Sequence, residues 1–360
     1  MIQNKKALVF THFDVPNFGA NLQAHAVSKF LKSYSIDAYF TKIHSPALES
    51  KYKKCVSSAQ LKMHKRFAET NLEISDIGKL DTNDLQAEIN SDFDFVVTGS
   101  DAVFKLDSNA QDRAELVYPN HYWLPFETSA KKFSFSASSM GTIFSQNIPR
   151  SKTAHFRGVV ESFDLITVRD RWTKSQLKKY VSKEVHITPD PVFTLGNAGS
   201  RTYGDYIAIC LPKRLRGDWE KSLITEIHRI GLDVKYVQTP EEITDNVVDP
   251  LEWYNLIANS KGYVGVRFHP IVIAISNGLP VVALDQYSKY PWNKQQSKTN
   301  DLVERYAPNG YVASKFEQFY LSTKTVMRSL SDQLDNQKET KSVVTDACFL
   351  PLAEFLSRNK

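Results

Sequence analysis

Short apolar runs alternate with segments of helical periodicity along most of the chain. The apolar runs are typical of buried strands, and the segments between them repeat apolar residues at the spacing of an amphipathic helix. The predicted strands cover residues 7–10, 37–40, 93–98, 132–137, 165–168, 206–211, 234–237, 263–266 and 281–284. Strands that alternate with helices form parallel sheets with crossover helices. The pattern therefore predicts an α/β protein with two Rossmann-like units.

A proline-rich stretch marks the predicted boundary between these units. Thr188–Pro189–Asp190–Pro191 contains two prolines, which interrupt helices and strand ladders alike. We therefore expect an N-terminal Rossmann-like domain over residues 1–187 and a C-terminal one over residues 188–312. The remaining segment, residues 313–360, shows the periodicity of amphipathic helices.

Composition and charge narrow the class of protein. The chain has 360 residues, 42% of them apolar, and contains no run of the ~18 apolar residues that a spanning helix needs. Three widely spaced cysteines suggest neither a disulfide framework nor a metal site, which fits a cytoplasmic protein. A net charge of +5 without concentrated basic blocks disfavours nucleic acid. It favours a small anionic substrate or a nearby membrane surface.

The most informative segment follows the predicted strand 263–266. Arg267 and His269 come directly after this strand, and Pro270 opens the next predicted helix. Lys289 follows the next strand along the chain. Ligands of open parallel sheets bind beyond the carboxyl ends of strands, and helix N-termini attract anions. Each of these groups alone is better explained by a surface ion pair, a helix cap or a solvated side chain, but their shared location predicts a phosphate and carboxylate site.

Arg169 is a second candidate for binding an anion. It also follows a predicted buried strand and precedes a predicted helix. The planar guanidinium can bind a carboxylate or a phosphate through two parallel hydrogen bonds. A salt bridge to Asp170, or one between domains, explains the same sequence equally well.

Two loops of the N-terminal half are candidates for binding sugar hydroxyls. Asn17 and Gly19 lie between the first strand and the first helix, and Gly19 allows close approach of a ligand to the backbone. Ser100 and Asp101 follow the strand 93–98 and offer a hydroxyl and a carboxylate. An ordinary turn with a helix cap explains either loop about as well.

Several of these segments together resemble the polysaccharide pyruvyltransferase family. The resemblance covers roughly residues 5–290 and rests on the order and spacing of its motifs. These are Asn17–Phe18–Gly19–Ala20–Asn21–Leu22–Gln23–Ala24, Thr98–Gly99–Ser100–Asp101, Lys132–Phe133–Ser134–Phe135–Ser136–Ala137–Ser138, Thr167–Val168–Arg169–Asp170, Pro189–Asp190–Pro191, Arg267–Phe268–His269, Pro280 and Lys289. The chain departs from the family in one place, because Pro270 stands where the family usually has glycine.

The resemblance implies a fold like that of GT-B glycosyltransferases. Two Rossmann-like domains would face each other across a cleft, and a C-terminal helix would return to the first domain. It also implies phosphoenolpyruvate as the donor and a sugar diol as the acceptor, in bacterial capsule, exopolysaccharide or cell-wall polymer synthesis. The acceptor can be lipid-linked, which is compatible with a cytoplasmic enzyme that associates peripherally with the inner face of the membrane.

By residue match, Arg169, His269 and Lys289 would be the donor-site residues. We expect His269 to be the general acid and base of ketal formation, since imidazole titrates near neutral pH. Arg169 and Lys289 would hold the carboxylate and phosphate, with Arg267 as a supporting charge. Asn17, Gly19, Ser100 and Asp101 would lie on the acceptor side. This scheme needs neither a metal nor a cofactor.

Two alternative functions are compatible with the sequence. A nucleotide-sugar glycosyltransferase of the same architecture could use a basic C-terminal site to bind a diphosphate. A non-catalytic carbohydrate-binding protein is the other alternative, because Pro270 removes a backbone N–H from the predicted anion site.

Overall fold

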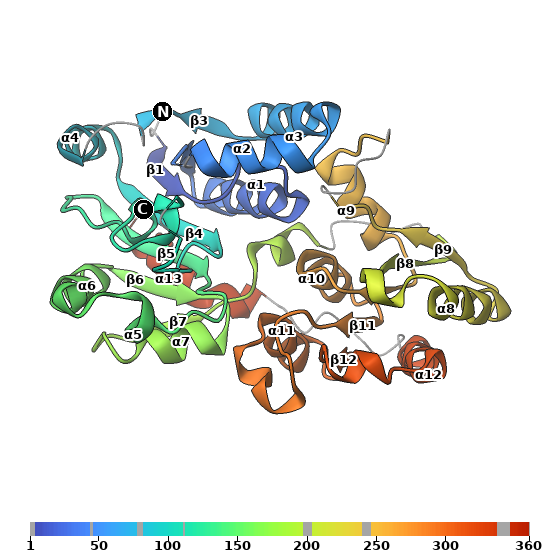
Figure 1. Cartoon of the computed structure of the whole chain (residues 1–360). Helices are drawn as coiled ribbons and strands as arrows, with labels where there is room; N and C mark the ends of the chain where they lie inside the picture. The colour runs from blue at the N-terminus through green and yellow to red at the C-terminus, as the bar shows by residue number, and fades with distance from the viewer. Residues whose placement is uncertain are drawn as a thin grey trace. The chain divides into compact units, whose positions relative to one another are not determined.

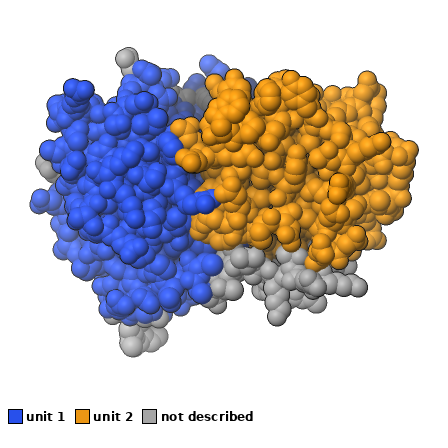
Figure 2. Space-filling model, turned by 90° about the horizontal axis from the view of Figure 1, so that it is seen from below, with its two compact units in different colours: residues 1–194, 240–250, 346–360 blue, residues 195–239, 251–345 orange. Residues whose placement is uncertain are grey.

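The computed structural model describes residues 4–43, 46–77, 82–110, 112–196, 204–239, 246–336 and 346–359. The chain divides into two compact units, which Figure 2 colours separately. Unit 1 comprises residues 1–194, 240–250 and 346–360, and unit 2 comprises residues 195–239 and 251–345.

Unit 1 is a Rossmann-like α/β layer structure (Figure 1). Within the described residues its parallel sheet has seven strands in the order β3-β2-β1-β4-β5-β6-β7. The strands are β1 (Lys5–Phe10), β2 (Ile36–Thr41), β3 (Glu73–Ser75), β4 (Phe95–Asp101), β5 (Lys131–Ala137), β6 (Leu165–Val168) and β7 (Val185–Ile187). The strand order reverses between β1 and β4, and ligands of such sheets bind at this switch point.

Helices cover both faces of this sheet. They are α1 (Phe18–Ser33), α2 (Pro46–Cys55), α3 (Ser58–Asn71), α4 (Thr82–Asp92), α5 (Phe144–Asn147), α6 (Thr153–Glu161), α7 (Arg171–Leu177) and α13 (Leu350–Arg358). Short 3-10 helices are η2 (Ala114–Leu116), η3 (His121–Trp123), η4 (Arg150–Lys152), η5 (Pro191–Leu195) and η10 (Asp346–Phe349). The C-terminal helix α13 packs against β6 (Figure 1). Its Phe355 ring lies 5.4 Å from that of Phe133 in β5.

Unit 2 has the same architecture with a smaller sheet. Its described residues form a five-stranded parallel sheet in the order β12-β11-β10-β8-β9, which reverses between β10 and β8. The strands are β8 (Tyr206–Cys210), β9 (Asp233–Tyr236), β10 (Gly262–Gly265), β11 (Val281–Leu284) and β12 (Tyr311–Ala313). The helices are α8 (Asp218–Arg229), α9 (Pro250–Ala258), α10 (Phe268–Ser276), α11 (Lys298–Tyr306) and α12 (Thr323–Asp335), with 3-10 helices η6 (Lys213–Leu215), η7 (Pro291–Gln296) and η8 (Glu317–Phe319).

The predicted α/β class with two Rossmann-like units is confirmed, whereas the cleft expected between the units stays a prediction. All nine predicted strands are present. Strands β3, β7 and β12 were not predicted, because a strand of three residues is too short to show a period. Helix α10 begins at Phe268, two residues before the predicted start at Pro270.

The units divide the chain at other places than the predicted boundaries. The predicted boundary after residue 187 falls inside unit 1, which continues to Thr194 because the Asp190 side chain is bound within that unit. Of the predicted helical segment 313–360, residues 313–345 belong to unit 2, where α12 packs on α8 and β11. Residues 346–360 belong to unit 1. Residues 337–345 lie outside the described part.

Candidate active site

The carboxyl end of β4 lies at the switch point of unit 1 and has an unusual backbone. Gly99 has a φ of +110°, and a Cβ atom there would lie 2.4 Å from the carbonyl oxygen of Phe135. Only glycine fits such a position. Asp101, two residues later, also has a positive φ of 81°. This backbone places Ser100 and Asp101 between β1 and β5.

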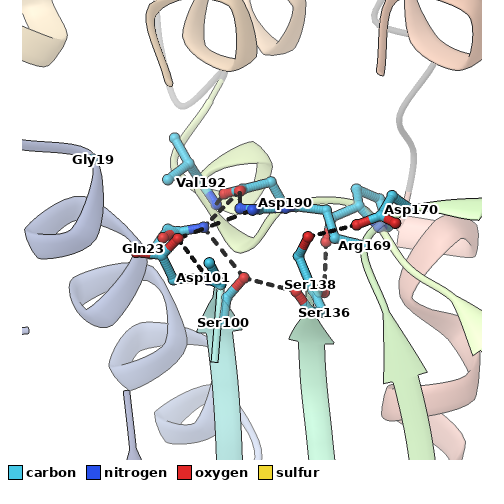
Figure 3. Close-up of polar contacts among 12 residues, drawn as sticks. Gly19, Gln23, Ser100, Asp101, Ser136, Ser138, Arg169, Asp170, Asp190 and Val192 are labelled. Carbon is cyan, nitrogen blue, oxygen red and sulfur yellow. Dashed lines mark hydrogen bonds and ion pairs between the residues drawn. The ribbon is translucent and has the colours of Figure 1, made fainter. Parts of the chain in front are cut away.

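Ser100 is fully buried in a hydrogen-bond network (Figure 3). Its hydroxyl donates to the carbonyl oxygen of Ser136 at 2.9 Å and accepts from Gln23 Nε2 at 3.2 Å. Its carbonyl oxygen accepts from the Thr11 hydroxyl at 2.8 Å. The hydroxyl of Ser100 therefore joins β4 to β5 and to helix α1, and its predicted contact with the acceptor stays a prediction.

Arg169 lies at the carboxyl end of β6 with its side chain only 2% exposed. Its Nη1 atom lies 2.7 Å from Asp190 Oδ2, and its Nη2 atom lies 4.0 Å from Asp101 Oδ1 (Figure 3). Burial opposes the charge of the guanidinium, but Asp190 and Asp101 more than offset it and raise the pKa of Arg169 above its ordinary value. The predicted donor-binding arginine is thus part of an internal ion-pair cluster of unit 1.

Asp190 is the centre of this cluster. Its Oδ2 also accepts from Gln23 Nε2 at 2.6 Å, and its Oδ1 accepts from the amide of Val192 at 3.1 Å (Figure 3). The alternative to anion binding by Arg169 was a salt bridge to Asp170 or to a residue of the other domain. Asp170 instead caps helix α7, since its Oδ1 accepts from the amide of Thr173 at 2.7 Å.

The loop between β1 and α1 forms a helix cap. The Asn17 side chain accepts from the amides of Gly19 and Ala20 at 3.0 and 3.3 Å, so α1 begins at Phe18 and includes Gly19, which the sequence pattern placed before the helix. Gly19 is buried within the first turn. The capping interpretation accounts for both residues, and their predicted contact with an acceptor stays a prediction.

A cavity of about 260 Å³ opens beyond the carboxyl ends of β1 and β2 in unit 1. Asp14 and Lys42 line it from the segments that follow these strands, and Tyr52 of α2 and Glu69 of α3 line it from the helices. Glu69 forms an ion pair with Lys65, which also lines the cavity, at 3.6 Å. Sequence analysis missed this cavity, because its walls come from separate elements and no local motif connects them.

The Arg267–Phe268–His269 motif forms the start of α10 in unit 2. Arg267 is the N-cap residue, and His269 is the second residue of the helix and is half-buried. The amide of Arg267 donates to the hydroxyl of Tyr263 at 3.4 Å, and burial raises the pKa of that hydroxyl well above its ordinary value. Pro270 occupies the third helical position, in the first turn, where proline is tolerated.

The loop after β11 carries Lys289. Asp285 organises this loop, because its carboxylate accepts from the amides of Tyr287 and Ser288 at 2.9 and 3.1 Å. The carbonyl oxygen of Lys289 accepts from the amide of Phe316 at 3.1 Å, and the Lys289 side chain is exposed. The backbone of the loop is therefore held in place while the lysine reaches solvent.

Strand pairing brings these two segments to one edge of the sheet of unit 2. Strands β10 and β11 are parallel neighbours, with Gly265 opposite Ala283. Arg267 and Asp285 each follow two residues after these partners, so the start of α10 and the Lys289 loop leave the sheet at the same level. Arg169 belongs to unit 1, and its predicted meeting with His269 and Lys289 in one pocket stays a prediction.

Among the residues in the described ranges, no group of three or more His, Cys, Asp or Glu side chains is arranged to hold a metal ion. None of the helices described has the length and apolar character needed to cross a membrane.

The two Rossmann-like units give the chain an α/β fold of the GT-B type. The second unit carries basic loops after two neighbouring strands. Similar solved structures include a UDP-N-acetylglucosamine 2-epimerase (TM-score 0.53, 15% identity, 99% of this chain and 96% of that chain covered). The UDP-GlcNAc 2-epimerase of Methanocaldococcus jannaschii gives a TM-score of 0.52 at 12% identity, with 99% of both chains covered. A putative UDP-N-acetylglucosamine 2-epimerase from Listeria monocytogenes gives 0.51 at 11% identity, with 99% and 97% covered. At these identities the likeness shows the fold alone.

The family is given by the sequence. The family model described as polysaccharide pyruvyl transferase matches residues 17–287, most of the chain, and the chain belongs to this family. The resemblance found in the sequence is thereby confirmed. A comparison with functionally curated proteins found no significant match.

Proposed function

We propose that this protein transfers the enolpyruvyl group of phosphoenolpyruvate to two hydroxyls of a sugar and forms a pyruvate ketal during bacterial surface polysaccharide synthesis. Family membership supports a transferase that acts on a polysaccharide. The observation that carries the donor assignment lies in unit 2, where parallel strands β10 and β11 present Arg267, His269 and Lys289 at one sheet edge. Such an edge, with a helix N-terminus, suits a small molecule with a carboxylate and a phosphate.

The proposed reaction conserves atoms and charge. A protonated His269 gives its proton to the methylene carbon of phosphoenolpyruvate, which becomes the methyl group of the ketal. One sugar hydroxyl attacks the resulting cationic carbon and loses its proton to the imidazole. A second hydroxyl displaces phosphate from the same carbon, and its proton leaves with the phosphate. Arg267 and Lys289 stabilise the carboxylate and the leaving phosphate.

Arg169 is proposed to act on the donor from unit 1. Its motif position and its place at the carboxyl end of β6 support this role. The cluster with Asp190 and Asp101 fixes the guanidinium, and a fixed charge stabilises a developing charge better than a mobile one does. No cofactor or metal takes part in the proposed reaction.

The acceptor sugar is proposed to bind in the cavity of unit 1. Its volume of about 260 Å³ is close to the lower end of ligand pockets, about 300 Å³. The Tyr52 ring offers a face for a sugar ring, and the carboxylates of Asp14 and Glu69 can accept from sugar hydroxyls. The predicted residues Ser100 and Asp101 lie at the same edge of the sheet, with Ser100 enclosed by its own network.

Phosphate release and product mass test the proposed function. The full chain is incubated with phosphoenolpyruvate and a panel of bacterial surface oligosaccharides, and phosphate and the mass of an added pyruvate ketal are measured. We expect both only when a suitable acceptor is present, and we expect His269→Ala to abolish them. Thermal stabilisation by a nucleotide sugar but not by phosphoenolpyruvate would instead favour a glycosyltransferase. Binding of glycans without any turnover would favour a carbohydrate-binding protein.

A further inference from the structure

Lys298, near the Arg267–Phe268–His269 motif, is a lysine whose side chain is largely buried, and no local motif points to it. It is the first residue of α11 in unit 2 and is only 9% exposed. Its ammonium nitrogen lies 4.5 Å from the centroid of the Phe268 ring and 4.8 Å from that of Tyr287. The lysine therefore touches both segments that carry the proposed donor residues, the start of α10 and the loop after β11.

No anionic partner within the described residues compensates this charge. No described carboxylate forms an ion pair with the Lys298 ammonium, and its contacts there are the two aromatic faces. Two acidic residues of the same loop and helix have other partners, since Asp285 accepts from loop amides and Asp301 pairs with Arg305 at 3.5 Å. A lysine with a largely buried side chain and no counter-ion has lost part of its hydration, and aromatic faces offset only part of that loss.

Its place in the helix adds to this cost. Lys298 follows the N-cap Ser297, whose hydroxyl accepts from the amide of Asn300 at 3.1 Å. The N-terminus of a helix carries a partial positive charge, so lysine at its first position is electrostatically unfavourable. The two aromatic rings pack against the lysine but supply no negative charge. An anionic ligand would satisfy both the ammonium and the helix end.

The start of α10 has fewer amide donors for an anion than most helix starts. Pro270 has no N–H, and the amide of Ile271 donates to the carbonyl oxygen of Arg267 at 3.4 Å. The first turn therefore offers an anion fewer amide donors than a turn without proline. The Lys298 ammonium, lying over the ring of the first residue of this helix, is placed to supply the missing donor.

We propose that Lys298 is an anion-binding residue of the donor site and contacts the phosphate or the carboxylate of phosphoenolpyruvate. This inference rests on the proposed function. The rings of Phe268 and Tyr287 contact the ammonium, so that it is oriented before the donor binds. Asp285 acts as a positioning residue, because its bonds to the backbone of Tyr287 and Ser288 fix one of the two rings.

The test compares donor binding by the full-length protein and three variants. Lys298→Met removes the charge and keeps the length of the side chain, and Lys298→Arg keeps a charge. Lys294→Met is the matched control, because Lys294 lies four residues earlier and pairs with Glu317 at 3.8 Å. Calorimetric titration with phosphoenolpyruvate should show affinity reduced about tenfold or more in Lys298→Met, the size expected for a charge-assisted contact. Lys298→Arg should retain part of the affinity, and Lys294→Met should bind as the wild type does.

A labelling experiment does not depend on the folding of any variant. Wild-type protein is treated with a lysine-acetylating reagent with and without phosphoenolpyruvate, and peptide masses report each lysine. We expect the donor to protect Lys298 and not Lys294. Equal labelling of Lys298 with and without bound donor, or unchanged affinity of Lys298→Met, would overturn the inference while leaving the proposed function intact.

If wild-type protein does not bind phosphoenolpyruvate, the proposed function fails instead. The same titration and labelling are then repeated with inorganic phosphate at constant ionic strength. Weaker phosphate binding by Lys298→Met alone, with protection of Lys298 by phosphate, supports an anion site of another activity. Equal binding by the variant and the control overturns that site as well.

Discussion

At the scale of single residues, unit 1 is stabilised by polar groups that are buried and paired. Arg169 and Asp190 are almost fully enclosed, with side chains 2% and 0% exposed. Such a pair contributes little net stability, but removal of one member leaves a buried charge without a partner. The arginine that resembles a donor-binding residue is therefore also a structural residue, and its substitution affects folding as well as activity.

The Asp190→Asn variant tests this ion pair. The amide keeps the shape of the side chain but removes the nearest counter-ion of Arg169 and leaves the more distant Asp101 at 4.0 Å, so we expect the free energy of unfolding to fall by about 3 kcal/mol. Urea denaturation followed by circular dichroism measures it. Asp37→Asn is the control, because the Lys32–Asp37 pair at 2.5 Å has side chains 64% and 31% exposed. A surface pair should contribute less than about 1 kcal/mol, and an equal loss in both variants would contradict the burial argument.

Two buried histidines of unit 1 predict a pH dependence of stability. Burial lowers the pKa of His64 to about 4, and burial together with the charge of Lys29 lowers that of His25 to about 4. His64 Nδ1 lies 2.6 Å from Asn21 Oδ1 and Nε2 lies 3.1 Å from Gln60 Nε2. The carboxamide oxygen accepts and the amide nitrogen donates, so this pairing fits a neutral ring with its proton on Nδ1.

The unfolded chain therefore binds more protons than the folded one between pH 6.5 and 4. The stability contributed by the two neutral histidines is fully present above their pKa in the unfolded chain. It falls as the pH drops toward their pKa in the folded protein. Each histidine contributes at most about 3 kcal/mol to this loss. Urea midpoints measured from pH 7.5 to 5 check it. His64→Gln should flatten the profile, whereas His228→Gln, at an exposed position, should not.

At the scale of elements, strand β4 requires a glycine, whereas helix α6 has space for a side chain at its glycine. Gly99 ends β4 with a φ of +110° and with the Phe135 carbonyl oxygen where a Cβ would be. Gly158 lies in α6 with nothing within 4 Å of a Cβ. The two residues look equivalent in the sequence.

Alanine substitutions should separate the two positions. Gly99→Ala combines a disfavoured backbone with a clash, so we expect a loss of stability of at least about 1–3 kcal/mol. Gly158→Ala should stabilise the protein by about 0.5–1 kcal/mol, because alanine favours the helix. Thermal unfolding measures both. Unchanged stability of Gly99→Ala would mean that the backbone at the end of β4 does not have this conformation.

The elements around the cavity of unit 1 predict an acceptor effect. Tyr52→Ala removes the aromatic wall, so we expect a several-fold higher KM for the glycan and an unchanged affinity for phosphoenolpyruvate. Steady-state kinetics with each substrate varied in turn distinguish the two. Tyr34→Ala, at the C-cap of α1 and outside the cavity, is the control. Equal effects of both variants would place the acceptor elsewhere.

At the scale of the whole molecule, the C-terminal residues complete unit 1. Leu352 and Leu356 of α13 are fully buried, and the Phe349 ring lies 5.6 Å from that of Phe30 in α1. The end of the chain thus belongs to the core of the unit in which the chain begins. The core of unit 1 therefore includes side chains of α13.

Leu352→Ala measures this contribution. A buried leucine replaced by alanine costs about 2–5 kcal/mol, so we expect unit 1 to unfold at lower denaturant concentration. Leu350→Ala is the control, because Leu350 is 50% exposed. Equal midpoints for the two variants would mean that α13 does not contribute to the core of unit 1.

The sequence by itself determined the elements and the class of fold. Alternation of apolar runs with helical periodicity located nine strands, because burial imposes a period on each element locally. The ordered motifs also identified the family and placed Arg267, His269 and Lys289 after strands that are neighbours in the sheet. Strands of three residues and the first residues of helices were not predicted, because too few residues contribute to their periodic pattern.

Only the tertiary structure decided which side chains meet. Asp190 pairs with Arg169 across 21 residues of sequence, and Lys298 lies over Phe268 from another helix. The cavity beside Tyr52 has walls from separate strands and helices. Such contacts depend on packing between elements, and no local pattern encodes the packing partner. The sequence determines which groups are available for chemistry. The packing determines which of them are enclosed, paired or accessible to a ligand.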